Sequence, residues 1–520
     1  MKLFRLAALA LAVAPLCMTA TAAPKTASKG KSAKMDKKTT MTEAELYDEQ
    51  FVAQFGDTSI PKGRKEEFFW DETDKLTSPT EKVQKQLTAA ADAISSASNV
   101  AWLKENRNRE WTRPDFPGVK IKLGDEVLFE DSTYTQLLKG KRIGLITNAT
   151  GMDSRFVSTI DKLAGSSDWK LTALFAPEHG IRGESGAGEK IKSGVDQVTG
   201  VPIYSLHGQD RSKRGQSKPR PSMLRDVDVL VYDIQDIGNR SYTYAGTMKL
   251  AMQAAKENNK EFIVLDRPNP LGGKLVSGNV ADPAYVTLVG WGPVAFLYGM
   301  TCGEMAQMLN VETGINCKLT VVPMKGWTRD MRWRDTGLPW IPTSTHMQTF
   351  EACWLIAITG TIGELNVINE GVGYPWPFGY VGAPWINSLR LAEELNSRKL
   401  PGLYFRPAYF RPYYHIFKDQ NCGGVEIHIL DEDKVMPVEA GIHVLDAINK
   451  LYPEQKVLIS GAGASKPKSR SRVSMFNKVM GGNTVRTMLL EGKSAEEVIA
   501  NWAPARDKFA KDREQYFLYK

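Results

Sequence analysis

The sequence has few of the residues that metal sites and disulfide scaffolds need. Five cysteines and six histidines are spread over 520 residues, without a C-x-x-C, H-x-H or H-E-x-x-H pattern. This spacing argues against a zinc knuckle, a thioredoxin-like site and a paired-histidine metal site. The glycine-rich run at 183–190 lacks the G-x-x-x-x-G-K-[ST] spacing of a phosphate loop, which argues against nucleotide binding. We therefore expect neither a metal nor a cofactor.

Long apolar runs are missing as well. After the first two dozen residues none approaches ~18 residues, the length that spans a bilayer, so we expect no transmembrane segment. Residues 1–23 are typical of a secretory signal peptide, because Lys2 and Arg5 precede an apolar stretch at 6–16 and a small-residue cleavage site ends at Ala22. The sequence thus predicts a periplasmic or secreted protein.

Excess positive charge is concentrated near the start of the chain. The formal net charge is +8, of which residues 1–23 contribute +2 and residues 24–42 contribute +5, leaving +1 for the rest. A body so close to neutral has no broad phosphate-binding face, which argues against a nucleic-acid partner. Residues 24–42 are rich in Lys, Ser, Thr and Ala, a composition that predicts disorder.

The cysteines that follow the leader leave two possibilities open. Cys302, Cys317, Cys353 and Cys422 could form two disulfides in an exported protein, or they could be buried free thiols. Their long and irregular spacings do not decide between these possibilities.

From about residue 141, short apolar runs alternate with helical patterns, which predicts an open, mostly parallel α/β sheet. The expected strands are 142–148, 171–176, 227–233 and 262–266, and the expected helices are 154–163 and 247–257. A later region is expected to contain helices at 389–397 and 441–450, a half-buried strand at 424–429 and a charged terminal helix from 494.

The expected domain organisation follows from these changes in composition and hydrophobic pattern along the chain. We predict a signal peptide at 1–23, a disordered basic segment at 24–42, a partly helical N-terminal extension at 43–138, a Rossmann-like domain at 139–330 and a smaller α/β domain at 331–520. Ligands of open α/β sheets bind beyond the carboxyl ends of the strands, where this sequence places polar residues.

Three motifs carry groups that could do chemistry, and each also has a structural interpretation. In 175–183, Glu178 follows an apolar strand and could act as a general acid, or it could pair with Arg182. In 231–240, Asp233 could bind a metal or sugar hydroxyls, or it could belong to a hydrogen-bond network. In 364–385, Glu370 precedes an aromatic and Pro/Gly-rich loop that could hold a sugar ring or pack on the sheet.

Together these segments resemble the NamZ-type exo-β-N-acetylmuramidases, a family of peptidoglycan hexosaminidases. The matching stretches are GLITNATG at 144–151, PEHGIRG at 177–183, YDIQDIG at 232–238, SYTY at 241–244, LDRPNP at 265–270, GAPW at 382–385, FRP at 405–407 and CGG at 422–424. The resemblance covers roughly residues 140–520. The chain departs from the family pattern at 371–374, which reads G-V-G-Y where G-R-G-T is usual, and at Gly379, where a glutamate is usual.

The resemblance implies a Rossmann-like domain followed by a smaller α/β domain, with the active site between them. It also implies release of N-acetylmuramic acid from the non-reducing end of wall glycans, so peptidoglycan fragments are the expected partner. It points to Glu178 as the catalytic glutamate, with Glu370 or Asp233 as the second carboxylate. The predicted substrate-binding residues are Asn148, His179, Arg182, Arg240, Tyr242, Asp266 and Trp385.

Within this interpretation, Arg182 or Arg240 is expected to pair with the lactyl carboxylate of the sugar. Two other functions stay open at this point. One is a non-catalytic wall-sugar binding protein on the same fold, and the other is a metal-dependent hydrolase of an ester or amide.

Overall fold

The computed structural model describes residues 116–182, 193–207, 218–460 and 467–520. All of them belong to one compact unit of the chain. The signal peptide expected at 1–23, the basic segment expected at 24–42 and the extension up to residue 115 lie outside the described residues. Those three expectations therefore stay predictions.

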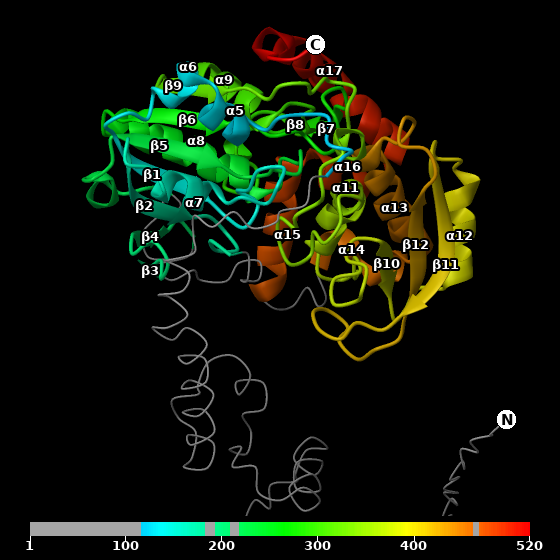
Figure 1. Ribbon diagram of the computed structural model, residues 1–520. Helices are drawn as coiled ribbons and strands as arrows, with labels where there is room; N and C mark the ends of the chain where they lie inside the picture. Colours follow the sequence, from blue (N-terminus) through cyan, green and yellow to red (C-terminus); the bar gives the residue numbers. More distant parts are fainter. Residues whose placement is uncertain (1–115, 183–192, 208–217, 461–466) are drawn as a thin grey trace, which may run out of the picture. The chain divides into compact units, whose positions relative to one another are not determined.

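A seven-stranded sheet forms the centre of the first domain (Figure 1). Across the sheet the order is β3 (Gly194–Val195), β4 (Pro202–Ser205), β2 (Lys170–Ala176), β1 (Arg142–Thr147), β5 (Val229–Asp233), β6 (Glu261–Leu265) and β9 (Lys318–Val322). Every neighbouring pair except β3 and β4 is parallel. The four predicted strands are confirmed as β1, β2, β5 and β6, with ends that differ by one or two residues.

Helices cover both faces of this sheet. The covering helices are α5 (Gly124–Glu130), α7 (Thr159–Ala164), α8 (Thr243–Glu257) and α9 (Cys302–Glu312). Successive residues of β5 enter different apolar clusters: Tyr232 packs in the cluster that includes α8 and α9, and Val231 packs in the cluster that includes α5 and α7. Burial of both faces explains why the strands are nearly continuous apolar runs in the sequence.

Residues 116–138 belong to the first domain, although the sequence suggested that they were part of the extension. Helix α5 packs on β6 and β9, and α6 (Ser132–Thr135) follows it. Gly124 N donates to Asp266 O at 2.9 Å, and a Cβ at Gly124 would lie 2.3 Å from Asp266 N. Only glycine lets α5 begin this close to the end of β6.

The second domain is built on a three-stranded antiparallel sheet. Its order is β10 (Tyr380–Ala383), β12 (Cys422–Ile429) and β11 (Leu403–Phe410), and its helices include α11 (Ala352–Gly363), α12 (Ser388–Ser397) and α13 (Pro437–Leu451). Helix α12 packs on β11 and β12, and α13 packs on α11 and α12. The predicted strand at 424–429 and the helices at 389–397 and 441–450 are confirmed. The fold is therefore α/β, with a mostly parallel sheet followed by a smaller domain.

The C-terminal part of the chain returns to the first domain. It packs through α17 (Ala495–Asp512) on the small antiparallel pair β7 (Ser277–Val280) and β8 (Ala295–Leu297). The remaining elements are η2 (Pro221–Leu224), η3 (Pro283–Tyr285), α10 (Trp333–Thr336), η4 (Pro453–Gln455), α14 (Val457–Ser460), α15 (Pro467–Met480), α16 (Thr484–Leu490) and η5 (Arg513–Tyr516). The two sheets thus lie on either side of the expected boundary at 330, while the terminal helix spans it.

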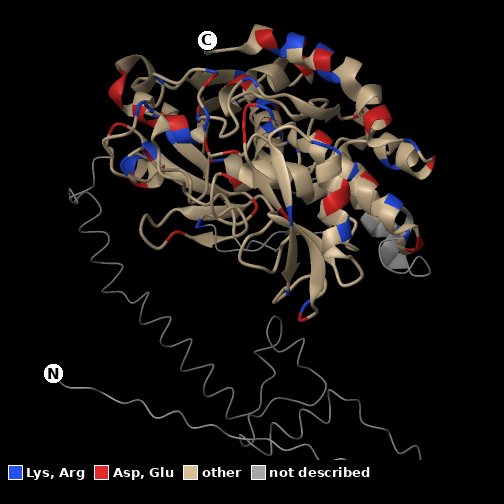
Figure 2. Ribbon diagram, turned by 90° about the vertical axis from the view of Figure 1, so that its right-hand side faces the viewer, with Lys and Arg blue, Asp and Glu red and all other residues tan. Residues whose placement is uncertain are grey.

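The four described cysteines are buried free thiols, which decides the question that their spacing left open. Burial raises the pKa of Cys317 and of Cys422 to about 11. Among the described helices, none is both long and apolar enough to cross a membrane. Figure 2 shows acidic and basic residues interspersed over the described helices.

Candidate active site

Glu178 lies in a tight turn at the carboxyl end of β2. Gly180 N donates to Pro177 O at 3.1 Å and closes this turn around Glu178 and His179. His179 has φ +72°, a left-handed conformation that costs a non-glycine residue free energy. Such strain collects at functional sites, because the surrounding structure has to hold it. The turn also lies at the edge of the sheet where open α/β folds bind ligands.

The Glu178 carboxylate is nearly enclosed, with polar groups on both oxygens. Only 9% of the residue is exposed. Thr243 Oγ1 donates to Oε2 at 2.7 Å, and His207 Nε2 lies 3.7 Å from Oε1. Thr243 is the first residue of α8, so the positive end of a 15-residue helix also favours negative charge at this position.

Aromatic rings connect the Glu178 turn to the second domain. The Tyr244 ring centroid is 6.4 Å from that of His179, edge to face, and 4.8 Å from that of Tyr242. The Tyr242 hydroxyl is 2.8 Å from Thr343 Oγ1, and the Tyr244 hydroxyl donates to the main-chain oxygen of Thr343. Asn148, at the end of β1, hydrogen-bonds the Tyr244 side chain. Asn148, Glu178, His179 and Tyr242, four of the residues predicted for the site, thus lie in one region of the structure.

Glu370 occupies the second domain's side of the site, on the loop after α11. It is 6% exposed, and a Cβ at Gly363 would lie 2.3 Å from its carboxyl carbon. The loop is fixed by Asn369, whose Nδ2 donates to Ile416 O at 3.1 Å. His415 Nε2 lies 3.8 Å from Glu370 Oε1. Glycine at 363 therefore makes the room in which this buried carboxylate sits beside a histidine.

A fourth histidine of this region, His346, contacts a tyrosine of the second domain. His346 Nε2 is 2.7 Å from the Tyr414 hydroxyl. Burial lowers the pKa of His346, and the charges of His179 and His415 lower it further. His346 is therefore within electrostatic reach of His179, which follows the first carboxylate, and of His415, which contacts the second.

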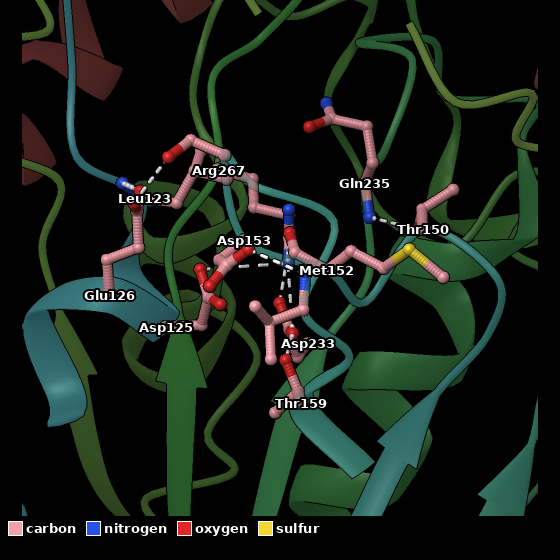
Figure 3. A network of polar contacts seen from close by, with 12 residues as sticks. Leu123, Asp125, Glu126, Thr150, Met152, Asp153, Thr159, Asp233, Gln235 and Arg267 are labelled. Carbon is pink, nitrogen blue, oxygen red and sulfur yellow. Dashed lines mark hydrogen bonds and ion pairs between the residues drawn. The ribbon is translucent and has the colours of Figure 1, made fainter. Parts of the chain in front are cut away.

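The structure gives Asp233 a different environment from the one expected for a catalytic carboxylate. Figure 3 shows it in a polar network at the end of β5, where it is fully buried. Arg267 donates to it twice, from Nε at 2.6 Å and from a terminal nitrogen at 2.9 Å, and Thr159 Oγ1 donates as well. Arg267 also lies 3.9 Å from Asp125, whose pKa burial raises to about 6. Asp233 is the counterion of a buried arginine.

Arg240 likewise has a structural environment instead of one suited to the sugar's carboxylate. Its side chain is fully buried above the Phe296 ring, with 5.1 Å from the guanidinium carbon to the ring centroid. It donates at 2.7 Å to the main-chain oxygens of Asn279, Val294 and Met480. Burial lowers the pKa of Arg240 to about 9. This guanidinium fastens three chain segments together and does not reach the site.

Asp266 and Trp385 are also held by the fold. The fully buried Asp266 carboxylate accepts hydrogen bonds from Thr301 Oγ1 at 2.7 Å, Gly303 N at 2.7 Å and the Tyr519 hydroxyl at 2.6 Å. Trp385 packs its ring 5.3 Å from the Tyr452 ring. These contacts give Asp266 and Trp385 structural roles, and none of them involves Glu178.

Arg182 differs from these groups because it is at the surface. Its side chain is 58% exposed, and its guanidinium lies 3.3 Å from Asp196 Oδ1. It follows the Glu178 turn by only a few residues, so it remains a candidate for binding an anionic group of the substrate.

Four site residues were not anticipated: Thr243, His207, His346 and His415. His207 could have been found, because it follows β4, and β4 pairs in parallel with β2. Polar residues at neighbouring carboxyl ends meet at one edge of a parallel sheet. His346 and His415 come from loops without any such signal. No group of three or more potential metal ligands occurs in the part of the chain that the structure describes.

Glu178 and Glu370 are buried carboxylates, one from each domain, and each has a histidine within 4 Å. A pair of Asp or Glu residues is what glycoside hydrolases use, so these two groups are consistent with an α/β glycoside hydrolase. Comparison with known proteins narrows this class. Residues 143–351 match the model of the exo-β-N-acetylmuramidase NamZ N-terminal domain, and residues 355–519 match that of its C-terminal domain. The chain belongs to the NamZ family, as its motifs indicated.

Individual relatives agree with this assignment. Over 400 residues the chain is 42% identical to the peptidoglycan β-N-acetylmuramidase NamZ of Bacillus subtilis (strain 168), a match that covers 77% of this chain and 92% of that protein. Crystal structures of two DUF1343 family proteins from Bacteroides fragilis NCTC 9343 each match 77% of the chain. One is 43% identical with a TM-score of 0.71, covering all of that protein, and the other is 29% identical with a TM-score of 0.60, covering 99%.

Proposed function

We propose that this protein is an exported exo-β-N-acetylmuramidase, which removes N-acetylmuramic acid from the non-reducing end of peptidoglycan fragments. The observation that carries the proposal is the buried Glu178 carboxylate, which accepts a hydrogen bond from Thr243 at the carboxyl edge of the sheet. The activity named for the Bacillus subtilis relative supports the choice of substrate.

The chemistry assigned to the two carboxylates follows from glycoside hydrolysis in general. Glu178, as the carboxylic acid, gives its proton to the glycosidic oxygen while the bond from that oxygen to the anomeric carbon breaks. Glu370 is the second carboxylate, which stabilises the positive charge that develops on the sugar ring. Water supplies the hydroxyl group of the released sugar and the proton that restores Glu178. Asp233 has no part in this scheme, because both its oxygens are engaged by Arg267.

The lactyl carboxylate distinguishes N-acetylmuramic acid from N-acetylglucosamine. Arg182 is the arginine near Glu178 whose side chain is exposed, and it is our candidate partner for that carboxylate. Its pairing with buried Asp196 pre-orients the guanidinium without enclosing it. Replacing Arg182 with Gln should therefore raise KM for the muramic acid substrate more than it lowers kcat.

Export is part of the proposal because the substrate lies outside the cytoplasm. It is supported by the leader at 1–23, with Lys2 and Arg5 before an apolar segment. N-terminal sequencing of the protein recovered from the periplasm or the medium should find a mature chain that begins directly after the small-residue cleavage site. A full-length chain retained in the cytoplasm would contradict export.

The decisive assay compares two chromogenic glycosides, one of N-acetylmuramic acid and one of N-acetylglucosamine. We expect turnover of the first, release of free N-acetylmuramic acid, and little turnover of the second. Activity on both alike would refute specificity for the lactyl group. Binding without turnover would favour a sugar-binding protein on this fold. Activity lost on chelation and restored by added metal would favour a metal-dependent hydrolase.

A further inference from the structure

A surface hollow in the second domain lies next to the proposed active site and has no assigned role. Its volume is about 620 Å³, and its lining includes Tyr374, Tyr409, Tyr413, Arg411, Asp419 and Asn421. This is within the size range of small-molecule sites, about 300–1,000 Å³. The lining combines flat aromatic rings with a cation, a carboxylate and an amide.

The aromatic rings are clustered and partly open to solvent. The Tyr374 ring lies 5.3 Å from the Tyr380 ring, 5.7 Å from Phe410 and 6.0 Å from Tyr413. Tyr413 is 59% exposed and Tyr409 is 74% exposed. Tyrosine offers a large rigid face and a polar tip at a low cost in conformational entropy, which suits a ligand with an apolar face and polar edges.

The lining residues Arg411, Tyr413, Asp419 and Asn421 lie on the loop that joins β11 to β12 (Figure 1), and this loop is held in a defined conformation. Tyr413 N donates to Gly373 O at 2.7 Å, and Asp419 N donates to Pro412 O at 2.9 Å. Phe417 has φ +62° and Asp419 has φ +61°, so non-glycine residues are kept in the left-handed region. A surface fixed in this way loses little entropy when a ligand binds.

The same loop links the hollow to the active site. Tyr413 lines the hollow, and the next two residues reach the site, since the Tyr414 hydroxyl contacts His346 and His415 contacts Glu370. An exo-acting enzyme holds one sugar on the non-reducing side of the bond that it cleaves. The rest of the chain must therefore leave the site over a neighbouring surface.

We infer that this hollow is a binding site for the glycan on the leaving side of the cleaved bond, where the sugar rings pack on the tyrosines. The inference rests on the proposed function, because it needs a glycan that enters the site by its non-reducing end. Arg411, Asp419 and Asn421 supply hydrogen bonds to the hydroxyl and acetamido groups at the edges of these sugars. The hollow confers a preference for longer chains.

The test measures KM for a chromogenic N-acetylmuramic acid glycoside and for peptide-free glycan chains of two and six sugars. In Tyr413→Ala, KM for the six-sugar chain should rise about threefold to tenfold relative to KM for the chromogenic glycoside, as expected for one lost aromatic contact. Tyr404→Ala is the control, because Tyr404 is an exposed tyrosine like Tyr413 but lies on β11 and does not line the hollow. It should leave both KM values at the wild-type level.

An unchanged KM ratio in Tyr413→Ala would overturn the inference while leaving the proposed function standing. The inference would also be overturned if Tyr413→Ala changed KM only for substrates that carry stem peptides, since the hollow would then bind the peptide and not the glycan. If the wild type cleaved none of these glycans, the proposed function would be wrong, and the hollow would need a separate binding test. Calorimetric titration with the six-sugar chain then decides about the hollow: weaker binding to Tyr413→Ala supports it, and equal binding overturns it.

Discussion

At the scale of single residues, the partner of each buried carboxylate separates structural from chemical roles. Asp233 is bonded twice by the Arg267 guanidinium, and Asp266 accepts four hydrogen bonds from groups that hold the fold. At the Glu178 carboxylate, the Thr243 hydroxyl donates a hydrogen bond and His207 lies 3.7 Å away. A carboxylate that neutralises a buried arginine is held in that structural role, because losing its charge would leave the arginine unpaired.

This distinction predicts the behaviour of Asp233→Asn. The substitution leaves a buried guanidinium without its main counterion, so the free energy of unfolding should fall by about 3–5 kcal/mol. Turnover per folded molecule should stay close to the wild-type value. Urea titration and kinetics on the folded fraction measure the two effects separately. A large loss of turnover with normal stability would instead show that Asp233 takes part in catalysis.

At the scale of elements, the sequence predicts best what is buried on both faces. Strands β1, β2, β5 and β6 stood out because central parallel strands are continuous apolar runs. Strands β4 and β9 did not, because half-buried residues such as Tyr204 and Thr320 break their apolar pattern. Missing β4 hid His207, whose place beside Glu178 depends on the pairing of β4 with β2.

The candidate site shows the same limit. Motifs at strand ends singled out Glu178, His179, Arg240 and Asp266 alike, but the side chains of Arg240 and Asp266 are fully buried in the fold. The direction of a side chain after a strand is decided by contacts with distant parts of the chain, here Met480 and Tyr519. A local pattern contains no information about those contacts.

The protonation of Asp266 should also affect the stability of the protein. This side chain joins the end of β6 to the start of α9 and to the C-terminal residues. Burial raises the pKa of Asp266 from 3.8 to about 7, against hydrogen bonds that lower it. The pKa of Asp266 is thus higher in the folded protein than in the unfolded chain. The contribution of Asp266 to the free energy of unfolding is therefore complete below about pH 4 and is lost as the pH rises through about 7.

This pH dependence can be tested by comparing the melting temperatures of the wild type and of Asp266→Asn. The Tm of the wild type minus that of Asp266→Asn should be larger at about pH 5 than at about pH 8, because the variant cannot ionise at this position. Differential scanning calorimetry at both pH values measures this difference. A difference that grew towards high pH would show that the pKa of Asp266 in the folded protein lies below its unfolded value.

At the scale of the whole molecule, the second domain completes a site that the first domain begins. Glu178, Thr243 and His207 come from the sheet domain, while Glu370, His346 and His415 come from loops between α10 and β12. Contacts through Thr343 and the return of α17 to β7 hold the domains in one unit. The geometry of the two carboxylates therefore depends on the domain interface as much as on either sheet.

The basic segment at 24–42 lies outside the described residues, and we propose from its composition that it is not needed for catalysis. Deleting it from the mature protein should leave turnover of a small chromogenic substrate unchanged, because a disordered segment contributes no core. Retention on anionic wall material should weaken, and more so at low salt, where the lysines are least screened. A large fall in turnover of the small substrate would show that the segment belongs to the active unit.

The measurement that tests the central claim most directly is the leaving-group dependence of Glu178→Gln. Glutamine keeps the shape and the hydrogen bond from Thr243 but cannot deliver a proton. Turnover of a disaccharide, with its poor leaving group, should fall by about 10²–10⁴-fold. The loss should be much smaller for a chromogenic glycoside, and the free energy of unfolding should barely change. Glu426→Gln, at a buried glutamate that pairs with Arg406 in the second domain, is the matched control and should keep its turnover. Near-normal turnover of the disaccharide by Glu178→Gln would contradict the account.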